Sequence, residues 1–241
     1  MRLKTFYLTL FGTILAYGPA PVRAQSEANV SRTIEAGHLR GVEAHAGFQV
    51  SIRQGKQSSA VISADSRLLP YLRVEVRDGI LHLGLNNLPH KLQVRTLARR
   101  AKVTVNSLDW VTTHSGAHVT GEGSFTAGKS TLEAHSGSRI DVVDLQADDV
   151  SVSTHSGAKI VVGGKAQSVE VSTHSGSKAD LEALRAARVS AEASSGSGLT
   201  CQPTESLDAH ASSGASIRYK SHTLNHSSVH SSSGGSVRSI Q

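Results

Sequence analysis

Residues 152–160, with the sequence VSTHSGAKI, decide how this chain folds, because close copies of this segment recur through the second half of the sequence. A Ser-Gly pair stands at its centre, and six further pairs have similar surroundings. The glycines of the seven pairs are Gly116, Gly137, Gly157, Gly176, Gly196, Gly214 and Gly234. Successive spacings are 21, 20, 19, 20, 18 and 20 residues. A repeat of this length is typical of a solenoid, in which each repeat forms one coil stacked on the last.

Alignment of the repeats on their glycines shows a period of two. Around Gly157, an apolar residue stands five positions before the glycine (Val152), a small one three before (Thr154) and a serine one before (Ser156). The third residue after the glycine is again apolar (Ile160). We expect these columns, the serines included, to face inward from β-strands, with the serine hydroxyls bonding along the stack. Each coil is then a strand, a glycine corner with positive φ, a second strand and a variable outer loop.

The first half carries a fainter version of the same pattern. Alternating segments at residues 60–64, 72–76, 80–85 and 101–105 predict strands, and Asp78-Gly79 predicts a hairpin turn between two of them. We therefore predict one all-β domain over residues 25–241. Its first coils, over residues 30–110, are irregular, and the seven regular Ser-Gly repeats occupy residues 111–241. The period predicts a β-solenoid with about 20 residues per coil.

The N-terminus predicts export. Arg2 and Lys4 precede an apolar run at residues 6–17, and small residues surround Ala24, as in a secretory signal peptide over residues 1–24. No apolar segment is long enough to span a bilayer comfortably, so we expect no membrane span. Removing residues 1–24 takes away three cations and lowers the formal charge from +6 to +3, which makes nucleic acid an unsuitable partner. We expect a periplasmic, outer-surface or extracellular location.

Cysteine is scarce, because Cys201 is the one cysteine in 241 residues. A single cysteine has no intramolecular partner, so the chain has no framework of internal disulfide bonds. Cys201 lies five residues after Gly196, in the column of Val142, Val162 and Leu181. We expect it to face inward and to behave as a small apolar side chain.

The chain resembles a known bacterial family, the "putative auto-transporter adhesin, head GIN" domains. The resemblance begins with GVEAHAGFQVSIRQG at residues 41–55 and continues through VEVRDGILHL at residues 74–83, AKVTV at residues 101–105 and the Ser-Gly repeats. It covers nearly all of the chain beyond the predicted signal peptide. The resemblance implies a right-handed, single-stranded β-helix in the bacterial envelope, and it carries no catalytic residues.

Two outward columns flank the corners of the first four repeats. The column two residues before the glycine holds His114, His135, His155 and His174. The column two residues after it holds His118, Arg139, Lys159 and Lys178. Both give way to serine or glycine in later repeats. Together they predict a strip about 15 Å long that suits an anionic glycan, a lipid head group or an envelope protein. The simpler interpretation, which the sequence favours, is a duplicated solvated face.

We expect a non-enzymatic envelope protein whose solenoid surface serves adhesion, scaffolding or ligand binding. The alternative is a polysaccharide-active β-helix enzyme, a lyase or a hydrolase, and hydrolases bring two carboxylates together. Outward acids such as Glu133 and Glu170 are scattered, and we place Asp148 and Asp149 in a loop, so we expect no catalytic residues and no cofactor. Stacked strands hold histidines about 4.8 Å apart, whereas tetrahedral zinc needs about 3.4 Å between ligand nitrogens, so we also expect no metal site.

Overall fold

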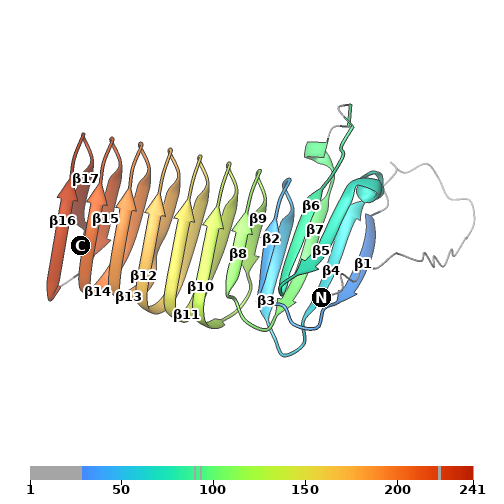
Figure 1. Cartoon of the computed structure of the whole chain (residues 1–241), viewed down its shortest axis with the longest axis horizontal. Helices are drawn as coiled ribbons and strands as arrows, with labels where there is room; N and C mark the ends of the chain where they lie inside the picture. Colours follow the sequence, from blue (N-terminus) through green and yellow to red (C-terminus); the bar gives the residue numbers. More distant parts are fainter. Residues whose placement is uncertain (1–28, 90, 93, 222–223, 241) are drawn as a thin grey trace, which may run out of the picture.

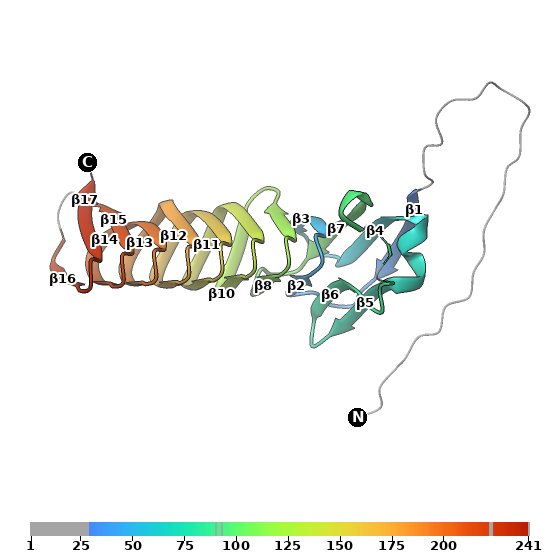
Figure 2. The same cartoon turned by 90° about the horizontal axis from the view of Figure 1, so that it is seen from above.

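A computed structural model describes residues 29–89, 91–92, 94–221 and 224–240. These residues form strands joined by short turns, together with the 3-10 helices η1 (Ser66–Tyr71) and η2 (Val94–Thr96). Coils about 20 residues apart stack along the long axis, so the chain is a β-solenoid (Figure 1). Figure 2 shows the same stack from above, with the more irregular strands at the N-terminal end. The predicted signal peptide, residues 1–24, lies outside the described residues.

The regular coils are built from strands that pair in parallel with their copies in the next coil. These strands are β8 (Trp110–Thr113), β9 (His118–Gly121), β10 (Phe125–Ala134), β11 (Arg139–Thr154), β12 (Lys159–Thr173), β13 (Lys178–Ala193), β14 (Gly198–Ala211), β15 (Ser216–Lys220), β16 (His226–Ser231) and β17 (Ser236–Ile240). The register joins equivalent positions, since Val152 pairs with Val171 and Ile140 pairs with Ile160. The columns aligned from the sequence are therefore real stacks.

The expected outer loop is wrong for the central coils. β11 is 16 residues long and runs from one Ser-Gly turn to the next, so the chain stays extended where a loop was predicted. The coil bends within this strand instead, and its register with β12 shifts between Val142 and Leu145. A β-bulge of this kind bends a strand without ending its hydrogen bonding. Asp148 and Asp149 consequently lie on β11 and not in a loop.

The N-terminal part mixes parallel and antiparallel pairs. Its strands are β1 (Asn29–Glu35), β2 (Gly41–Ala44), β3 (Gln49–Gln54), β4 (Ser59–Asp65), β5 (Leu72–Arg77), β6 (Ile80–Leu85) and β7 (Arg99–Val105). β4 is antiparallel to β1 and β7, and the predicted hairpin joins β5 to β6 through Asp78 and Gly79, which both have positive φ. These pairs cover the N-terminal end of the stack (Figure 1).

The first coil does not follow sequence order in space. β2 pairs in parallel with β6 on one side and with β8 on the other, and β3 pairs in the same way with β7 and β9. The segment at residues 41–54 is thus inserted between strands that lie at least 26 residues further along the chain. This arrangement places residues 43–45 beside residues 82 and 114.

The predicted apolar columns form the core. The three columns represented by Val152, Thr154 and Ile160 are buried, and Cys201 is 1% exposed, as expected. The last described coil is an exception, because Val229 is 47% exposed and Ser231 is exposed as well. Burying valine, leucine and isoleucine side chains in this way stabilises the fold by roughly 1.5–3 kcal/mol each.

Candidate functional site

The Ser-Gly pair makes a tight turn in which both residues are left-handed. Ser156 has φ of 53° and Gly157 has φ of 70°, and Ala158 N donates to His155 O at 3.2 Å across the turn. The same pair of positive φ values occurs at all seven Ser-Gly pairs. Gly157 N donates to Ser175 O in the next coil at 3.2 Å, which ties successive turns into a row. The predicted glycine corners are confirmed.

The serine of each pair is not buried, so its predicted inward orientation is wrong. Ser156 is exposed, as are its copies in the other turns. Two successive left-handed residues break the alternation of inward- and outward-facing side chains along a strand. Thr154 faces inward, but the alternation does not extend from Thr154 to Ser156. The position after the glycine points inward instead, where Ala158 and Ser177 are buried.

The histidine column forms a ladder of stacked rings beside the row of turns. The ring centroids of His114 and His135 are 4.7 Å apart, those of His135 and His155 are 5.0 Å apart, and those of His155 and His174 are 4.9 Å apart. The ring planes are within 15° of parallel. This spacing is that of the hydrogen-bonded strands that carry the rings.

The ladder has a fifth member that the predicted strip omits. His45 stacks on His114 with centroids 4.6 Å apart and planes 10° apart. The sequence signal was present, because EAHAG at residues 43–47 resembles EAHSG at residues 133–137. We define the histidine ladder as His45, His114, His135, His155 and His174.

Burial and the neighbouring rings favour the neutral imidazole at two ladder positions, His114 and His155. Partial burial lowers the pKa of His155, and the neighbouring His135 and His174 lower it further, while Glu133 opposes the shift. Burial likewise lowers the pKa of His114, with His45 and His135 adding to the effect. Lowered pKa values follow because a second positive ring about 5 Å away disfavours protonation.

Hydroxyl groups hold two of the ladder rings in place. Ser153 Oγ lies 3.0 Å from His155 Nε2, and His174 Nδ1 lies 2.6 Å from Ser194 Oγ. Ser194 occupies the histidine position in the following coil, so the ladder ends on a hydrogen bond. The rings of His155 and His174 are therefore oriented by neighbouring hydroxyl groups.

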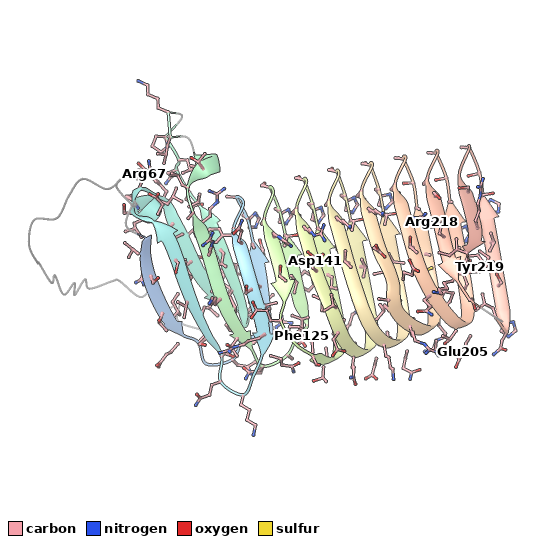
Figure 3. The ribbon with its side chains drawn as sticks, turned by 180° about the vertical axis from the view of Figure 1, so that it is seen from behind. Arg67, Phe125, Asp141, Glu205, Arg218 and Tyr219 are labelled. Carbon is pink, nitrogen blue, oxygen red and sulfur yellow. The ribbon has the colours of Figure 1, made fainter. Side chains whose placement is uncertain are left out.

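The basic column lies on the other side of the row of turns. Arg139 pairs in register with His118 and with Lys159, and Lys159 pairs with Lys178. Asp141, labelled in Figure 3 on the wall of the solenoid, interacts with His118 and Arg139. It lies 2.6 Å from His118 Nε2 and accepts two hydrogen bonds from Arg139, at 2.6 and 2.7 Å.

Positive charge is consequently concentrated at the later end of the basic column. Burial opposes ionisation of Asp141, but the hydrogen bonds with Arg139 and His118 outweigh burial and lower the pKa of Asp141. Asp141 therefore neutralises positive charge at the earlier end of the basic column, where these two side chains lie. Among the described residues, neither Lys159 nor Lys178 forms an ion pair. Each predicted column is thus brought together, and the two columns flank the turns without forming one continuous patch.

A groove on the opposite part of the coil is not predicted by the sequence. It has a volume of about 830 Å³ and crosses the strands from β10 to β14 and β16. The stacked Val150, Val169, Val189 and Leu207 line it, with polar residues on either side. Asp149, Glu170 and Asp208 line it together with Lys129 and Arg188, so its charge is mixed. The groove follows the strand residues that come after the bend, and part of this segment was predicted to be a loop.

Comparison with known proteins agrees with this architecture. Residues 38–223 match the family model described as "Putative auto-transporter adhesin, head GIN domain". No curated protein matches the sequence. No helix in the described part of the chain is long and apolar enough to cross a membrane.

Several crystal structures share the fold at low sequence identity. A putative adhesin from Bacteroides fragilis is 19% identical with a TM-score of 0.81, over 89% of this chain and 98% of its own. A putative adhesin from Parabacteroides merdae is 14% identical with a TM-score of 0.71, over 90% of this chain and 98% of its own. A protein from Parabacteroides distasonis, described as a putative lipid binding protein, is 15% identical with a TM-score of 0.70, over the same shares of the two chains.

Proposed function

The chain belongs to the family of putative auto-transporter adhesins with a head GIN domain, and from this premise we propose that it is a non-enzymatic, exported envelope protein that binds an anionic glycan. The binding surface is the row of Ser-Gly turns with the histidine ladder on one side and the basic column on the other. A rigid solenoid offers a repeating surface, which suits a ligand that also repeats.

One observation carries this proposal. Lys159 and Lys178 are register neighbours with no ion pair among the described residues, and they belong to the same coils as His155 and His174. Adjacent like charges repel one another, and an anion shared between them relieves that repulsion. A uronate or sulfate chain running along the turns supplies such anions at intervals.

The basic column also distinguishes one part of the solenoid from another. The next coil carries Gly198 at the lysine position and Ser194 at the histidine position. Serine or glycine is therefore compatible with the fold at both places. The cations of coils three and four are not needed for stacking, which favours a role in binding.

A direct test uses polygalacturonate as the acidic polysaccharide and dextran as the neutral one, with the exported chain immobilised. We expect saturable binding of polygalacturonate that weakens as salt is added, and no binding of dextran. Lys159→Ser with Lys178→Ser should weaken binding about tenfold, since two charged contacts at the surface contribute roughly 0.7 kcal/mol each.

The matched control is Lys165→Ser with Arg185→Ser. These two exposed cations are also register neighbours on β12 and β13, but they lie at the bend, away from the turns. They should leave the affinity unchanged. An equal loss in both double variants would mean general charge attraction and would overturn the site. Shortening of the polymer would favour the enzyme alternative, and binding only to phosphatidylglycerol vesicles would favour a lipid head group.

A further inference from the structure

Four side chains with metal-ligating atoms meet at the start of the histidine ladder. β2 lies between β6 and β8, and Glu43 is in register with His82 on one side and with Thr112 on the other. His45 lies two residues after Glu43, and His114 N donates to Ala44 O at 2.9 Å. Glu43, His45, His82 and His114 therefore come from three adjacent parallel strands and gather at one place on the surface. We call these four residues the Glu43 cluster.

The distances within the cluster are short. Glu43 Oε1 lies 2.6 Å from His45 Nε2, and Glu43 Oε2 lies 3.0 Å from His82 Nδ1. One ligand atom from each of Glu43, His45 and His114 can be chosen so that all three lie within 4.8 Å of one another. Within the described part of the chain, no other set of three histidine, cysteine or acidic side chains meets this condition.

The charges of the cluster suit a cation. Glu43 is the one carboxylate of the cluster, and it faces three imidazoles. The side chains of Glu43 and His82 are 27% and 25% exposed, so the carboxylate is partly shielded from water. Neutral imidazoles and a carboxylate are the forms in which these residues bind metal ions.

We propose that Glu43, His45 and His114 bind a divalent transition-metal ion, with zinc as the best-matched ion. Two imidazole nitrogens and one carboxylate oxygen form a common three-ligand set for zinc, at bond lengths of about 2.0–2.2 Å. Ligand atoms in a tetrahedron lie about 3.4 Å apart. Glu43 Oε1 and His45 Nε2 lie 2.6 Å apart, and one ligand atom from each of the three residues lies within 4.8 Å of the others, so we expect side-chain rotation to bring them to bonding distance of one ion.

His82 orients the carboxylate and does not bind the ion. Its Nδ1 lies beside Glu43 Oε2, while Oε1 faces His45, so the two carboxylate oxygens have different partners. Hydrogen bonds to the second oxygen of a ligating carboxylate fix its direction and change metal affinity by about 10- to 100-fold when removed. His82 is therefore a positioning residue.

Thr112 supplies a second, independent observation. It lies beside Glu43 in register and two residues before His114, and it is 5% exposed. Its hydroxyl is buried without a hydrogen-bond partner among the described residues, which is uncommon in folded proteins. A water molecule in the fourth coordination position of the metal would give this hydroxyl a partner.

The expectation of no metal site rested on the roughly 4.8 Å spacing of the stacked histidines, and for His135, His155 and His174 that argument still holds. His135, His155 and His174 have nearly parallel ring planes 4.9–5.0 Å apart, and parallel rings do not direct their lone pairs at one point. His45 and His114 are stacked in the same way, with centroids 4.6 Å apart and planes 10° apart, so at least one of these two rings must turn out of the stack to bind the ion. The Glu43 cluster differs from the rest of the ladder because the carboxylate of Glu43 already lies against His45 and supplies a third ligand. The ion would occupy the end of the ladder distant from Lys159 and Lys178.

The test titrates the chelator-treated full chain with zinc chloride by isothermal calorimetry and records the visible spectrum with cobalt(II). We expect one equivalent to bind with micromolar or tighter affinity, and an intense cobalt spectrum indicating four-coordinate geometry. Glu43→Gln and His45→Ser should each weaken binding by at least tenfold, and His82→Ser should weaken it about tenfold. All three positions are partly exposed, and circular dichroism checks that each variant is folded.

The matched control is His155→Ser with His174→Ser, which removes two ladder rings and leaves the cluster intact. Its zinc affinity should equal that of the original chain. Loss of binding in this control, or unchanged binding in both Glu43→Gln and His45→Ser, would overturn the proposal, as would the absence of saturable binding. These outcomes are independent of the glycan test, which changes Lys159 and Lys178.

Discussion

Thr154 Oγ1 lies 2.8 Å from Ser177 Oγ in the next coil, and both hydroxyls are buried. Ser177 Oγ also donates to Thr154 O at 2.8 Å, so Thr154 is left as the donor between the two hydroxyls. The pair links the residue three before one glycine to the residue after the following glycine. It is a polar link through an otherwise apolar core.

The same link recurs wherever the sequence allows it. Thr113 lies 2.8 Å from Ser138, and Thr173 lies 2.9 Å from Ser197. In the remaining coils both positions lose their hydroxyls together, as in Ala134 with Ala158 and Ala193 with Ala215. A threonine with no serine opposite would lose its shortest hydrogen bond, and a buried hydroxyl left unpaired costs about 1–3 kcal/mol. The chain therefore uses either two hydroxyls or none.

The first prediction tests this pairing. Ser177→Ala should lower the free energy of unfolding by about 1–3 kcal/mol, because Thr154 keeps a buried hydroxyl without its partner. Adding Thr154→Val removes that hydroxyl at nearly constant shape and should restore most of the loss. Denaturant unfolding of the two single variants and the double variant measures the coupling. Additive effects would show that the hydroxyls do not stabilise one another.

The second prediction concerns two kinds of glycine. Gly157 has φ of 70°, but an added Cβ would meet no atom within 4 Å, so Gly157→Val suffers only from backbone strain of about 1–3 kcal/mol. Gly164 has φ of 123°, and its Cβ would lie 2.0 Å from Leu145 O. Gly164→Ala should therefore be the more destabilising of the two.

The control for both glycines is Gly128→Ala. Gly128 lies in β10 without a positive φ, and its Cβ would also meet nothing within 4 Å. This substitution should leave stability unchanged or raise it by about 0.4–1 kcal/mol, since alanine restricts the unfolded chain. The denaturation midpoint measures all three variants. A stable Gly157→Val protein would contradict the need for positive φ at the turn.

The third prediction concerns Cys201. Burial raises its pKa to about 12, and it is 1% exposed, so both access and thiolate formation are suppressed. A thiol reagent should leave the native chain unlabelled and react fully after denaturation. Glu205→Cys in a Cys201→Ala background provides the exposed control, because Glu205 lies on the surface of the same strand. Rapid native labelling of Cys201 would contradict its place in the core.

Ser156 shows how far sequence periodicity extends. The alternation correctly predicted the strands on both sides of the turn, since a period of two describes any strand with one buried face. It failed at the turn itself, because the left-handed pair Ser156-Gly157 breaks the alternation. It also failed at the bend, where extended chain with a bulge has no simple period. The core was predictable where the backbone stayed regular.

The Glu43 cluster lay beyond the reach of the sequence for a different reason. Glu43 is 39 positions from His82 and 71 from His114. They meet because β2 is inserted between β6 and β8, against sequence order. No local pattern specifies such an insertion, since it depends on which strand edges pair over long range. His114, His135, His155 and His174 were visible as a column because their strands stack in sequence order.

The last prediction concerns the effect of pH on the ladder, through His155. His155 is surrounded by His135 just after β10, His174 just after β12 and Glu133 on β10, and burial together with the two histidines lowers its pKa. An unfolded chain has an ordinary histidine pKa of about 6.5 and so takes up a proton before the folded chain does. Stability should therefore be unaffected above that value and should fall as pH decreases from about 6.5 towards the folded pKa. His155→Ser with His174→Ser removes two of these rings and should make the decrease in melting temperature between pH 7.5 and pH 5 smaller.

His210→Ser is the control for the ladder variant. His210 lies 3.2 Å from the carboxylate of Asp208 and outside the ladder, so its loss should not make the decrease in melting temperature smaller. Equal pH profiles for the original chain and the ladder variant would mean that the stacked rings accept protons without cost.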